Sequence, residues 1–317
     1  MSSSVPRAKL ARLAQSPATH RRRIVIASTG ILVLLGLVSY FGISAFAADK
    51  LSRPQRRPLT FTPADYGLKY ERVQFSSAID HIPLDGWYID SPGSKVILMM
   101  HGKDGARDDT TLNLMELMQA LAQNGYDVFT FDFRGHGLSG GERYSFGDLE
   151  RRDVAGALSY LKSRGVDEVG VVAFSMGAAT ALNSAPAHPE MRAIVADSSF
   201  ADMNMLLEDG LPKASGLPAF FSPGILLTAR LMYGMDLAAV KPANVLASLG
   251  DRPILLIHGT GDPAISMLHH ELMVKAALGN PNAQSWVVPG ADHAQSFKQE
   301  PQEYVRRVLA FFKQYWL

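Results

Sequence analysis

Short apolar stretches alternate with amphipathic ones along most of the chain, from about residue 66 to the C-terminus. Unbroken apolar runs at Val96–Met100, Val128–Phe131 and Val169–Ala173 are typical of strands buried on both faces of a sheet. Stretches with helical periodicity lie between and after such runs: Thr111–Gln123, Leu149–Arg164, Met176–Ser184, Met267–Ala277 and Gln302–Tyr315. This alternation predicts an α/β fold, with a mostly parallel sheet covered by helices on both faces.

Two regions depart from this alternation. Tyr70–Phe75 and Leu84–Ile89 alternate apolar with polar residues, which predicts an antiparallel pair at the edge of the sheet. Between residues 198 and 250, apolar helical pieces are interrupted by Pro212, Pro218 and Pro223. We interpret residues 198–250 as a small helical cap inserted over the sheet, although two ordinary covering helices would give a similar pattern. The methionines and aromatic residues of this insertion would suit an apolar acyl group.

The N-terminal region is of a different kind. Residues 24–48 form an uncharged stretch of 25 residues directly after Arg21, Arg22 and Arg23, long enough for a helix to cross a hydrocarbon layer of about 30 Å. We predict a basic cytoplasmic segment (1–23), a transmembrane signal anchor (24–48), a linker (49–65) and a globular domain (66–317). The alternative is a signal peptide cleaved after Ala45-Phe46-Ala47, but the apolar stretch exceeds the usual signal core of about 7–15 residues.

Charge separates the two parts of the chain. Residues 1–57 hold ten Lys or Arg against one acid, whereas the remainder holds 21 bases against 29 acids. The acidic domain disfavours nucleic acid as a partner, and the basic flanks of the anchor suit anionic lipid headgroups. Six basic residues precede the apolar stretch and four follow it closely, which predicts a cytoplasmic N-terminus and an exocytoplasmic domain. The chain has no cysteine, which excludes disulfides and thiolate metal sites.

Ser175 lies between a predicted strand and a predicted helix. A serine at such a corner exposes its hydroxyl above the sheet, and small residues must lie two positions before and after it. Here these residues are Ala173 and Gly177. The pattern is therefore A-x-S-x-G, which by chance alone is not rare, and its meaning depends on the rest of the chain.

The ends of the other predicted strands carry a consistent set of residues. Asp262 follows the strand at Ile254–Ile257, and His293 follows the strand at Trp286–Val288. The carboxyl ends of parallel strands meet at one edge, so we expect Ser175, Asp262 and His293 to meet there in the order Ser, Asp, His. The imidazole would take the serine proton, and the carboxylate would orient and stabilise the imidazole.

Alternatives remain for these assignments. Asp197 and Asp292 compete with Asp262 for the role of acid. Five other histidines compete with His293: His101, His136 and His258, which we interpret as turn-packing residues, and His269 and His270 on a predicted helix. The backbone N–H groups of Lys103 and Met176 are the expected oxyanion donors. Asp132 and Arg134 are interpreted as a structural pair. No spacing points to a metal, nucleotide or other cofactor.

Five motifs in order resemble the α/β-hydrolase superfamily: His101-Gly102, Asp132 to Ser139 (DFRGHGLS), Phe174 to Gly177 (FSMG), His258 to Asp262 (HGTGD) and Gly290 to His293 (GADH). The match is closest to bacterial, membrane-anchored serine aminopeptidase-like and BEM46-like hydrolases, and it covers about Tyr66 to Leu317. The resemblance implies an eight-stranded, mostly parallel sheet, esterase-type chemistry, no cofactor, and the Ser175–Asp262–His293 triad. Ala173 and Pro263 depart from the family pattern, but neither replaces a reactive group.

The leading hypothesis is a membrane-anchored serine hydrolase that cleaves carboxylic esters or thioesters of a small-molecule or lipid-like acyl substrate. A peptidase or amidase of the aminopeptidase type is the alternative within the enzyme class, since the same residues could protonate an amine leaving group. A non-catalytic, membrane-anchored binding module is the alternative of another class.

Overall fold

One eight-stranded sheet runs through the globular domain of the computed structural model, which describes residues 17–316. In their order across the sheet, the strands are β1 (Tyr70–Ser76), β2 (Pro83–Ile89), β4 (Tyr126–Phe131), β3 (Lys95–Met100), β5 (Val169–Phe174), β6 (Met191–Asp197), β7 (Ile254–Gly259) and β8 (Ala283–Val288). Strand β2 is antiparallel to both β1 and β4, and all other neighbours are parallel. The predicted fold, including the antiparallel edge pair, is confirmed.

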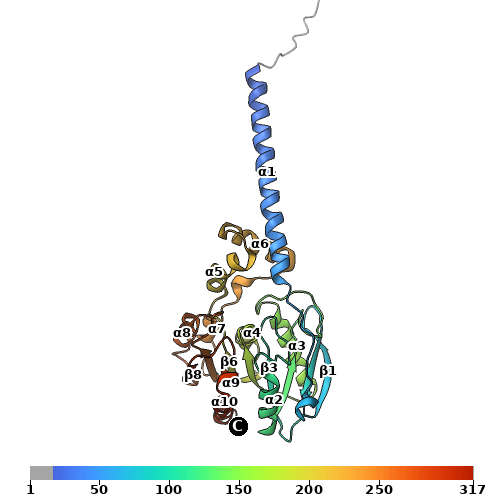
Figure 1. The fold of residues 1–317 in the computed structure, drawn as a ribbon, viewed down its shortest axis with the longest axis vertical. Helices are drawn as coiled ribbons and strands as arrows, with labels where there is room; N and C mark the ends of the chain where they lie inside the picture. Colours follow the sequence, from blue (N-terminus) through green and yellow to red (C-terminus); the bar gives the residue numbers. More distant parts are fainter. Residues whose placement is uncertain (1–16, 317) are drawn as a thin grey trace, which may run out of the picture.

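Helices cover both faces of this sheet (Figure 1). One face packs against α3 (Glu150–Ser163), α4 (Met176–Ser184), α7 (Pro242–Leu246) and α8 (Met267–Ala276). The other packs against α2 (Leu114–Gln123), α9 (Ser296–Gln299) and α10 (Pro301–Tyr315). Every residue of β5 is buried, because a central parallel strand has an apolar layer on either side. Two short 3₁₀ turns, η1 (Pro63–Tyr66) and η2 (Ala185–Ala187), complete the domain.

Helix α2 begins three residues later than the sequence predicts. The Asp109 carboxylate accepts hydrogen bonds from the backbone N–H and the hydroxyl of Thr111, which fixes a local turn instead of the first helical turn. Asn113 then has a φ of +55°, a left-handed conformation that no α-helix continues through. The helix therefore starts at Leu114.

The segment between β6 and β7 forms the cap. It contains α5 (Met203–Ser215), η3 (Ala219–Phe221), α6 (Ser222–Tyr233) and η4 (Leu237–Ala239). Helix α7, which lies within the predicted insertion of residues 198–250, packs against α4 and α8 and contributes Leu246 to the main core. The cap in space thus ends before α7, and the last part of the insertion belongs to the layer that covers the sheet.

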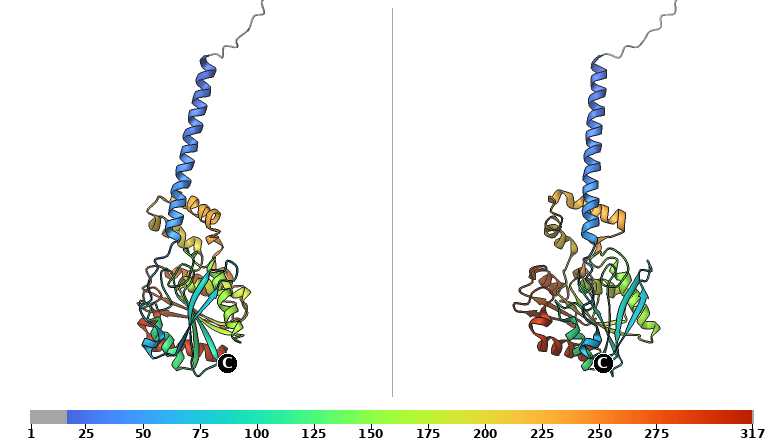
Figure 2. Two further views of the ribbon diagram at one scale, coloured as in Figure 1. Left: turned by 90° about the vertical axis from the view of Figure 1, so that its right-hand side faces the viewer. Right: turned by 45° about the vertical axis from the view of Figure 1, so that its right-hand side comes forward.

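Helix α1 (Pro17–Ser52) projects from the domain, and the cap lies around its C-terminal end in each view (Figures 1 and 2). Among the described residues, one helix is long and apolar enough to cross a membrane, at His20–Ser52. It includes the predicted anchor (24–48) and continues into the predicted linker (49–65). Residues 1–16 of the predicted cytoplasmic segment lie outside the described residues.

Candidate active site

The side chains of Ser175, Asp262 and His293 meet beyond the carboxyl ends of β5, β7 and β8. These strands run parallel within one sheet, so the loops that follow them share one edge. His293 Nε2 lies 2.7 Å from Ser175 Oγ, and His293 Nδ1 lies 2.7 Å from Asp262 Oδ2. Three residues separated by up to 118 positions in the chain thus form one continuous chain of hydrogen bonds.

Ser175 occupies a sharp corner between β5 and α4. Its φ of +52° and ψ of −118° are seldom adopted by non-glycine residues, and its N–H is held by the carbonyl of Asp197 at 2.8 Å. A Cβ at Gly177 would lie 2.4 Å from the carbonyl oxygen of His101, so only glycine lets α4 approach β3 this closely. Ala173 is fully buried in β5, and its methyl group is accommodated in the core.

Asp262 is held as an ionised acceptor. Its Oδ1 accepts hydrogen bonds from the N–H groups of Ala264 and Ile265, each at 2.8 Å; Pro263 has no N–H, and the amides after it serve instead. Burial raises the pKa of Asp262, but the hydrogen bond from His293 and the two backbone donors outweigh this effect, and the net pKa lies below its usual value. The carboxylate is therefore charged at neutral pH and faces the imidazole with Oδ2.

This arrangement selects the tautomer of His293. An ionised Asp262 accepts only, so Nδ1 carries a proton toward it and Nε2 presents its lone pair to the hydroxyl of Ser175. The side chain of Asp262 is buried, whereas the imidazole is partly exposed. The imidazole is thus accessible to substrate while its orienting partner is shielded from water.

The two backbone groups expected to meet an oxyanion flank Ser175. Met176 is the first residue of α4, and Lys103 lies in the turn after β3. A Cβ at Gly102 would lie 3.1 Å from Ser175 Cβ, which places this turn directly against the serine. Within residues 17–316, neither the Met176 nor the Lys103 N–H donates to another protein group, so both are available to a ligand.

Two buried histidines brace the turn that carries Lys103. The Phe133 N–H donates to Nε2 of His101 at 3.0 Å, and the Asp104 N–H donates to Nε2 of His136 at 3.1 Å. Burial lowers the pKa of both imidazoles to about 4, so both are neutral and can accept these bonds near pH 7. Their role agrees with the interpretation as turn-packing residues.

Asp132 and Arg134 do not pair with each other as the sequence interpretation assumed. Asp132 accepts from the N–H groups of Arg107 and Leu138 at 2.8 and 2.9 Å. Arg134 instead donates to Asp153 and Asp80: its Nη2 lies 2.7 Å from Asp153 Oδ1, and its Nη1 lies 2.7 Å from Asp80 Oδ2. Both residues close the loop after β4, but through separate partners.

Asp197, one of the alternative acids, is fully buried and lies in a different network. Its Oδ1 accepts from the hydroxyls of Ser198 and Ser296 at 3.0 and 3.2 Å, and Ser198 Oγ in turn accepts from the N–H of Ala294 at 3.0 Å. Asp292, the other alternative, accepts from the backbone N–H of His293 at 2.6 Å. Of the three carboxylates, Asp262 is the one whose oxygen lies against the imidazole.

Replacement of Asp197 by asparagine is expected to stabilise the protein at neutral and alkaline pH. Burial raises the pKa of Asp197 to about 6 from 3.8, so the folded state holds a proton that the unfolded state has lost. The stability contributed by that proton is fully present below about pH 4 and is lost as the pH rises through about 6, a loss of about 3 kcal/mol. Thermal unfolding between pH 4 and pH 8 should show equal stability at pH 4 and a growing advantage of Asp197→Asn up to pH 6. An advantage independent of pH would contradict the expectation.

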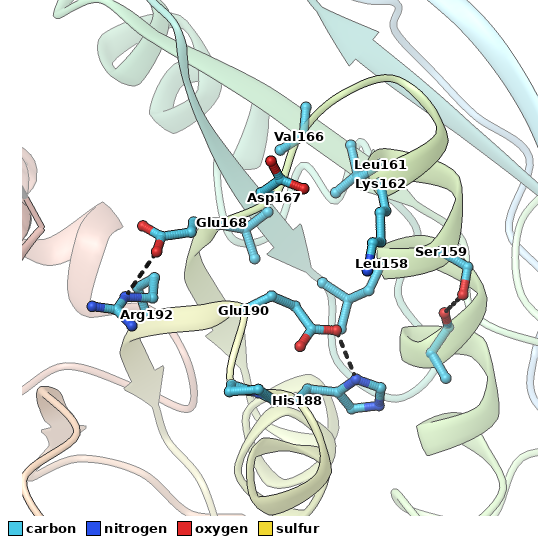
Figure 3. Close-up of a pocket in the computed structure, with 13 residues that line it drawn as sticks. Leu158, Ser159, Leu161, Lys162, Val166, Asp167, Glu168, His188, Glu190 and Arg192 are labelled. Carbon is cyan, nitrogen blue, oxygen red and sulfur yellow. Dashed lines mark hydrogen bonds and ion pairs between the residues drawn. The ribbon is translucent and has the colours of Figure 1, made fainter.

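A cavity of about 520 Å³ lies away from this site (Figure 3). It is lined near Val169 and Arg192, where β5 and β6 begin, whereas Ser175 follows the end of β5. Four of its polar groups form pairs, Arg192 with Glu168 and His188 with Glu190. Ligands of parallel sheets bind at the opposite edge, so this cavity is not the catalytic site.

Within residues 17–316, no group of three or more His, Cys, Asp or Glu side chains is arranged to hold a metal ion. His269 and His270 have separate partners: His269 Nδ1 accepts from the N–H of Ala201 at 3.1 Å, and His270 Nε2 lies 2.9 Å from Ser285 Oγ.

Comparisons with known proteins indicate a hydrolase family. The family described as serine aminopeptidase, S33, matches residues 92–232. The uncharacterized protein YqkD of Bacillus subtilis is 30% identical over 229 residues, which cover 70% of this chain and 72% of YqkD. The uncharacterized protein YfhR of Escherichia coli K12 is 26% identical over 250 residues, which cover 76% of this chain and 80% of YfhR.

Solved structures extend the likeness to the whole domain. The Pyrococcus furiosus esterase Pf2001 is 27% identical, with a TM-score of 0.70 over 83% of this chain and 99% of the esterase. The α/β hydrolase GrgF from Penicillium sp. sh18 shares the fold, with a TM-score of 0.61 over 78% of this chain and 99% of GrgF at 16% identity. With the sheet order, the sharp corner at Ser175 and these relatives, the chain belongs to the α/β-hydrolase superfamily.

Proposed function

We propose that the protein is a membrane-anchored serine hydrolase that cleaves carboxylic esters or thioesters through an acyl-serine intermediate. The observation that carries the proposal is the continuous hydrogen-bonded chain from Ser175 Oγ through His293 to Asp262. Similarity to an esterase over 83% of the chain supports it. In this proposal Ser175 is the nucleophile, His293 the general base and acid, and Asp262 the residue that orients the imidazole.

The first half-reaction would transfer the acyl group to the enzyme. Ser175 Oγ attacks the carbonyl carbon while its proton passes to His293 Nε2, and Asp262 stabilises the resulting imidazolium. Negative charge on the carbonyl oxygen would be met by the N–H groups of Met176 and Lys103, and one such donor typically contributes about 3–4 kcal/mol. The tetrahedral intermediate then collapses, and the alcohol or thiol leaves with the proton from Nε2.

The second half-reaction would restore the enzyme. Water takes the place of the leaving group, gives its proton to His293 Nε2 and attacks the acyl carbon. Collapse of the second intermediate breaks the bond to Ser175 Oγ, which recovers its proton from the imidazolium. The carboxylic acid product leaves.

The proposed anchor is α1. Its apolar, exposed stretch begins directly after Arg21, Arg22 and Arg23, and the excess of basic residues before it favours a cytoplasmic N-terminus. The catalytic domain would then lie on the exocytoplasmic side, which is periplasmic or extracellular. Membrane lipids would be its partners through the anchor.

A peptidase of the aminopeptidase type is the second candidate, because the matching family is described as serine aminopeptidase. The two activities separate in one assay that compares aminoacyl p-nitroanilides with p-nitrophenyl acyl esters. Preference for the ester supports the proposal, and efficient turnover of an anilide with a free amino terminus would replace it with the peptidase function.

Labelling with a fluorophosphonate probe tests whether the protein is an enzyme or a binding module. We expect the full-length protein to gain one phosphonyl group, which peptide mass mapping places on Ser175, and we expect Ser175→Ala to remain unlabelled. The probe requires a nucleophilic serine, so Ser175 left unmodified at saturating probe would favour the non-catalytic module.

A further inference from the structure

The cap is built onto the C-terminal third of α1 (Figure 2). The Tyr40 hydroxyl donates to the carbonyl of Phe220 and accepts from the N–H of Gly224, both at 3.0 Å. Its ring stacks on Phe221 with centroids 5.2 Å apart. A Cβ at Gly224 would lie 2.4 Å from Ser44 Oγ, so α6 can approach α1 this closely only because residue 224 is glycine. Helix α1 is therefore part of the cap's own packing.

The contact continues toward the domain. Ala47 and Ala48 of α1 are buried in one apolar cluster with cap residues, among them Leu211, Ile225 and Ala229. At the end of this contact between α1 and the cap, Asp49 accepts a hydrogen bond from the hydroxyl of Tyr233 at 3.1 Å and forms an ion pair with Arg143 of the domain. The cap is thus held at a fixed position along α1, beside residues 40–49.

In the proposed anchoring, this part of α1 is where the helix leaves the lipid, on the side of the membrane away from Arg23. Tyr40 lies 17 residues after Arg23, which is about 25 Å along a helix. Asp49 lies 26 residues after Arg23, or about 39 Å. A hydrocarbon layer of about 30 Å ends between them. Tyr40, Phe220 and Phe221 would then lie at the depth where aromatic residues gather in membrane proteins.

The cap exposes an apolar face beside this same part of α1. Leu227 and Leu231 are one helical turn apart on α6, Met232 follows Leu231, and Phe220 lies in η3 just before the helix; all four side chains are exposed. Phe220 is 66% and Leu231 75% exposed. The opposite side of α6, with Ile225 and Ala229, is buried against α1 and Leu211 of α5. The outward side is apolar except for Arg230, and a helix with apolar residues on both sides is typically covered on both.

A narrow apolar cavity lies between α1, the cap and the domain loop that holds Tyr144 and Phe146. Its volume is about 50 Å³, and its lining includes Ala48, Leu51, Ile225, Tyr144 and Phe146. Tyr144 lies under the Lys103 side chain, 5.5 Å from ring centroid to Nζ, and Lys103 carries one of the expected oxyanion donors. Tyr144 thus contacts both this cavity and the Lys103 side chain, whereas none of Ser175, Asp262 and His293 lines the cavity.

We infer that the η3–α6 face of the cap, formed by Phe220, Leu227, Leu231 and Met232, is a membrane-docking surface that rests in the lipid leaflet where α1 ends. The same face would deliver the substrate, an ester with a long acyl chain that stays dissolved in the bilayer while its carbonyl group reaches Ser175. The lipid contact stands without the proposed function, whereas the substrate class rests on it. Phe220 lies against Tyr40 of α1, with ring centroids 5.0 Å apart, so the exposed apolar surface of α1 continues into this face. The occupant we infer is therefore lipid.

The lipid contact is tested without catalysis. The chain has no cysteine, so Leu231→Cys places a single environment-sensitive fluorophore on the face, and Leu278→Cys, at a leucine 79% exposed after α8, is the matched control. In phosphatidylcholine vesicles holding full-length protein, doxyl-labelled lipid should quench the fluorophore at 231 about twofold or more and leave the one at 278 nearly unchanged. Equal behaviour of the two positions, or shielding of 231 from water without quenching by lipid, as a protein partner would cause, overturns the inference.

The delivery of substrate is tested with two esters. Leu231→Glu should lower hydrolysis of 4-methylumbelliferyl oleate embedded in vesicles about tenfold or more, because a carboxylate on this face resists burial in lipid. Hydrolysis of water-soluble p-nitrophenyl acetate should stay within about twofold, as should both activities of Leu278→Glu. Equal loss on both esters, or no loss on the embedded one, refutes delivery from the bilayer. Inactivity of the wild type on both esters would instead refute the proposed function, with the quenching result unaffected.

Discussion

Replacement of Ser175 by alanine is expected to lower kcat for p-nitrophenyl esters about a millionfold, because neither attack on the carbonyl nor an acyl intermediate is possible without Oγ. The imidazole of His293 and the two oxyanion donors would remain, and they account for the small residual rate expected over water. Initial rates with p-nitrophenyl butyrate, at saturating substrate, measure the effect.

A second serine provides the control. Ser184 lies at the end of the same helix, is buried, and its hydroxyl has no hydrogen-bond partner among the described residues. Ser184→Ala should keep its activity within about twofold, since it removes no interaction. A Ser175→Ala protein that retained about one per cent or more of the wild-type rate would mean that another group attacks the ester.

The same position should also show a conflict between activity and stability. Ser175 holds a φ of +52° and a ψ of −118°, a strained conformation that glycine adopts at much lower cost. Ser175→Gly should therefore be inactive but more stable than wild type by about 1 kcal/mol, measured as a higher midpoint of thermal unfolding. Lower stability of the glycine variant would show that the corner is not strained.

Local patterns suffice to predict the sheet and the positions of the three side chains. The strands of the centre are continuous apolar runs, and residues that follow parallel strands meet at one edge whatever lies between them. Ser175 and His293 are 118 positions apart, yet the order of the strands alone brings their loops together. The sequence favours Asp262 over Asp197 and Asp292 by its place after the strand at Ile254–Ile257, but which oxygen faces the imidazole can be read only from coordinates.

Contacts between distant segments could not be predicted in the same way. Arg134 is two residues from Asp132 but reaches Asp80 and Asp153, which are 54 and 19 positions away. Side chains close in sequence point in different directions along an extended loop, and the hydrophobic pattern does not predict which partner each one contacts. Likewise, the close approach of Gly224 to Tyr40, 184 positions away, leaves no trace in the hydrophobic pattern, since a single glycine within a helix does not indicate which segment packs against it.

Replacement of Asp262 by asparagine is expected to lower kcat about ten-thousandfold through the tautomer of His293. The N–H groups of Ala264 and Ile265 both donate to Oδ1, so an asparagine must place its carbonyl oxygen there and its NH₂ group where Oδ2 now faces His293 Nδ1. The NH₂ group donates, so Nδ1 must accept and the imidazole proton moves to Nε2. Nε2–H then points at Ser175 Oγ and cannot take its proton, although the fold and the distances are retained.

Asp292 is the matched control for this change, because its carboxylate lies next to the same histidine but accepts only from the backbone N–H at 2.6 Å. An asparagine oxygen can accept that bond equally well, so Asp292→Asn should keep kcat within about twofold. Equal thermal stability of Asp262→Asn and wild type would separate a tautomer effect from unfolding. If Asp262→Asn lost less than about tenfold while Asp197→Asn lost activity severely, the orienting carboxylate would be Asp197, and the hydrogen bond of 2.7 Å between Asp262 and His293 would have no part in the chemistry.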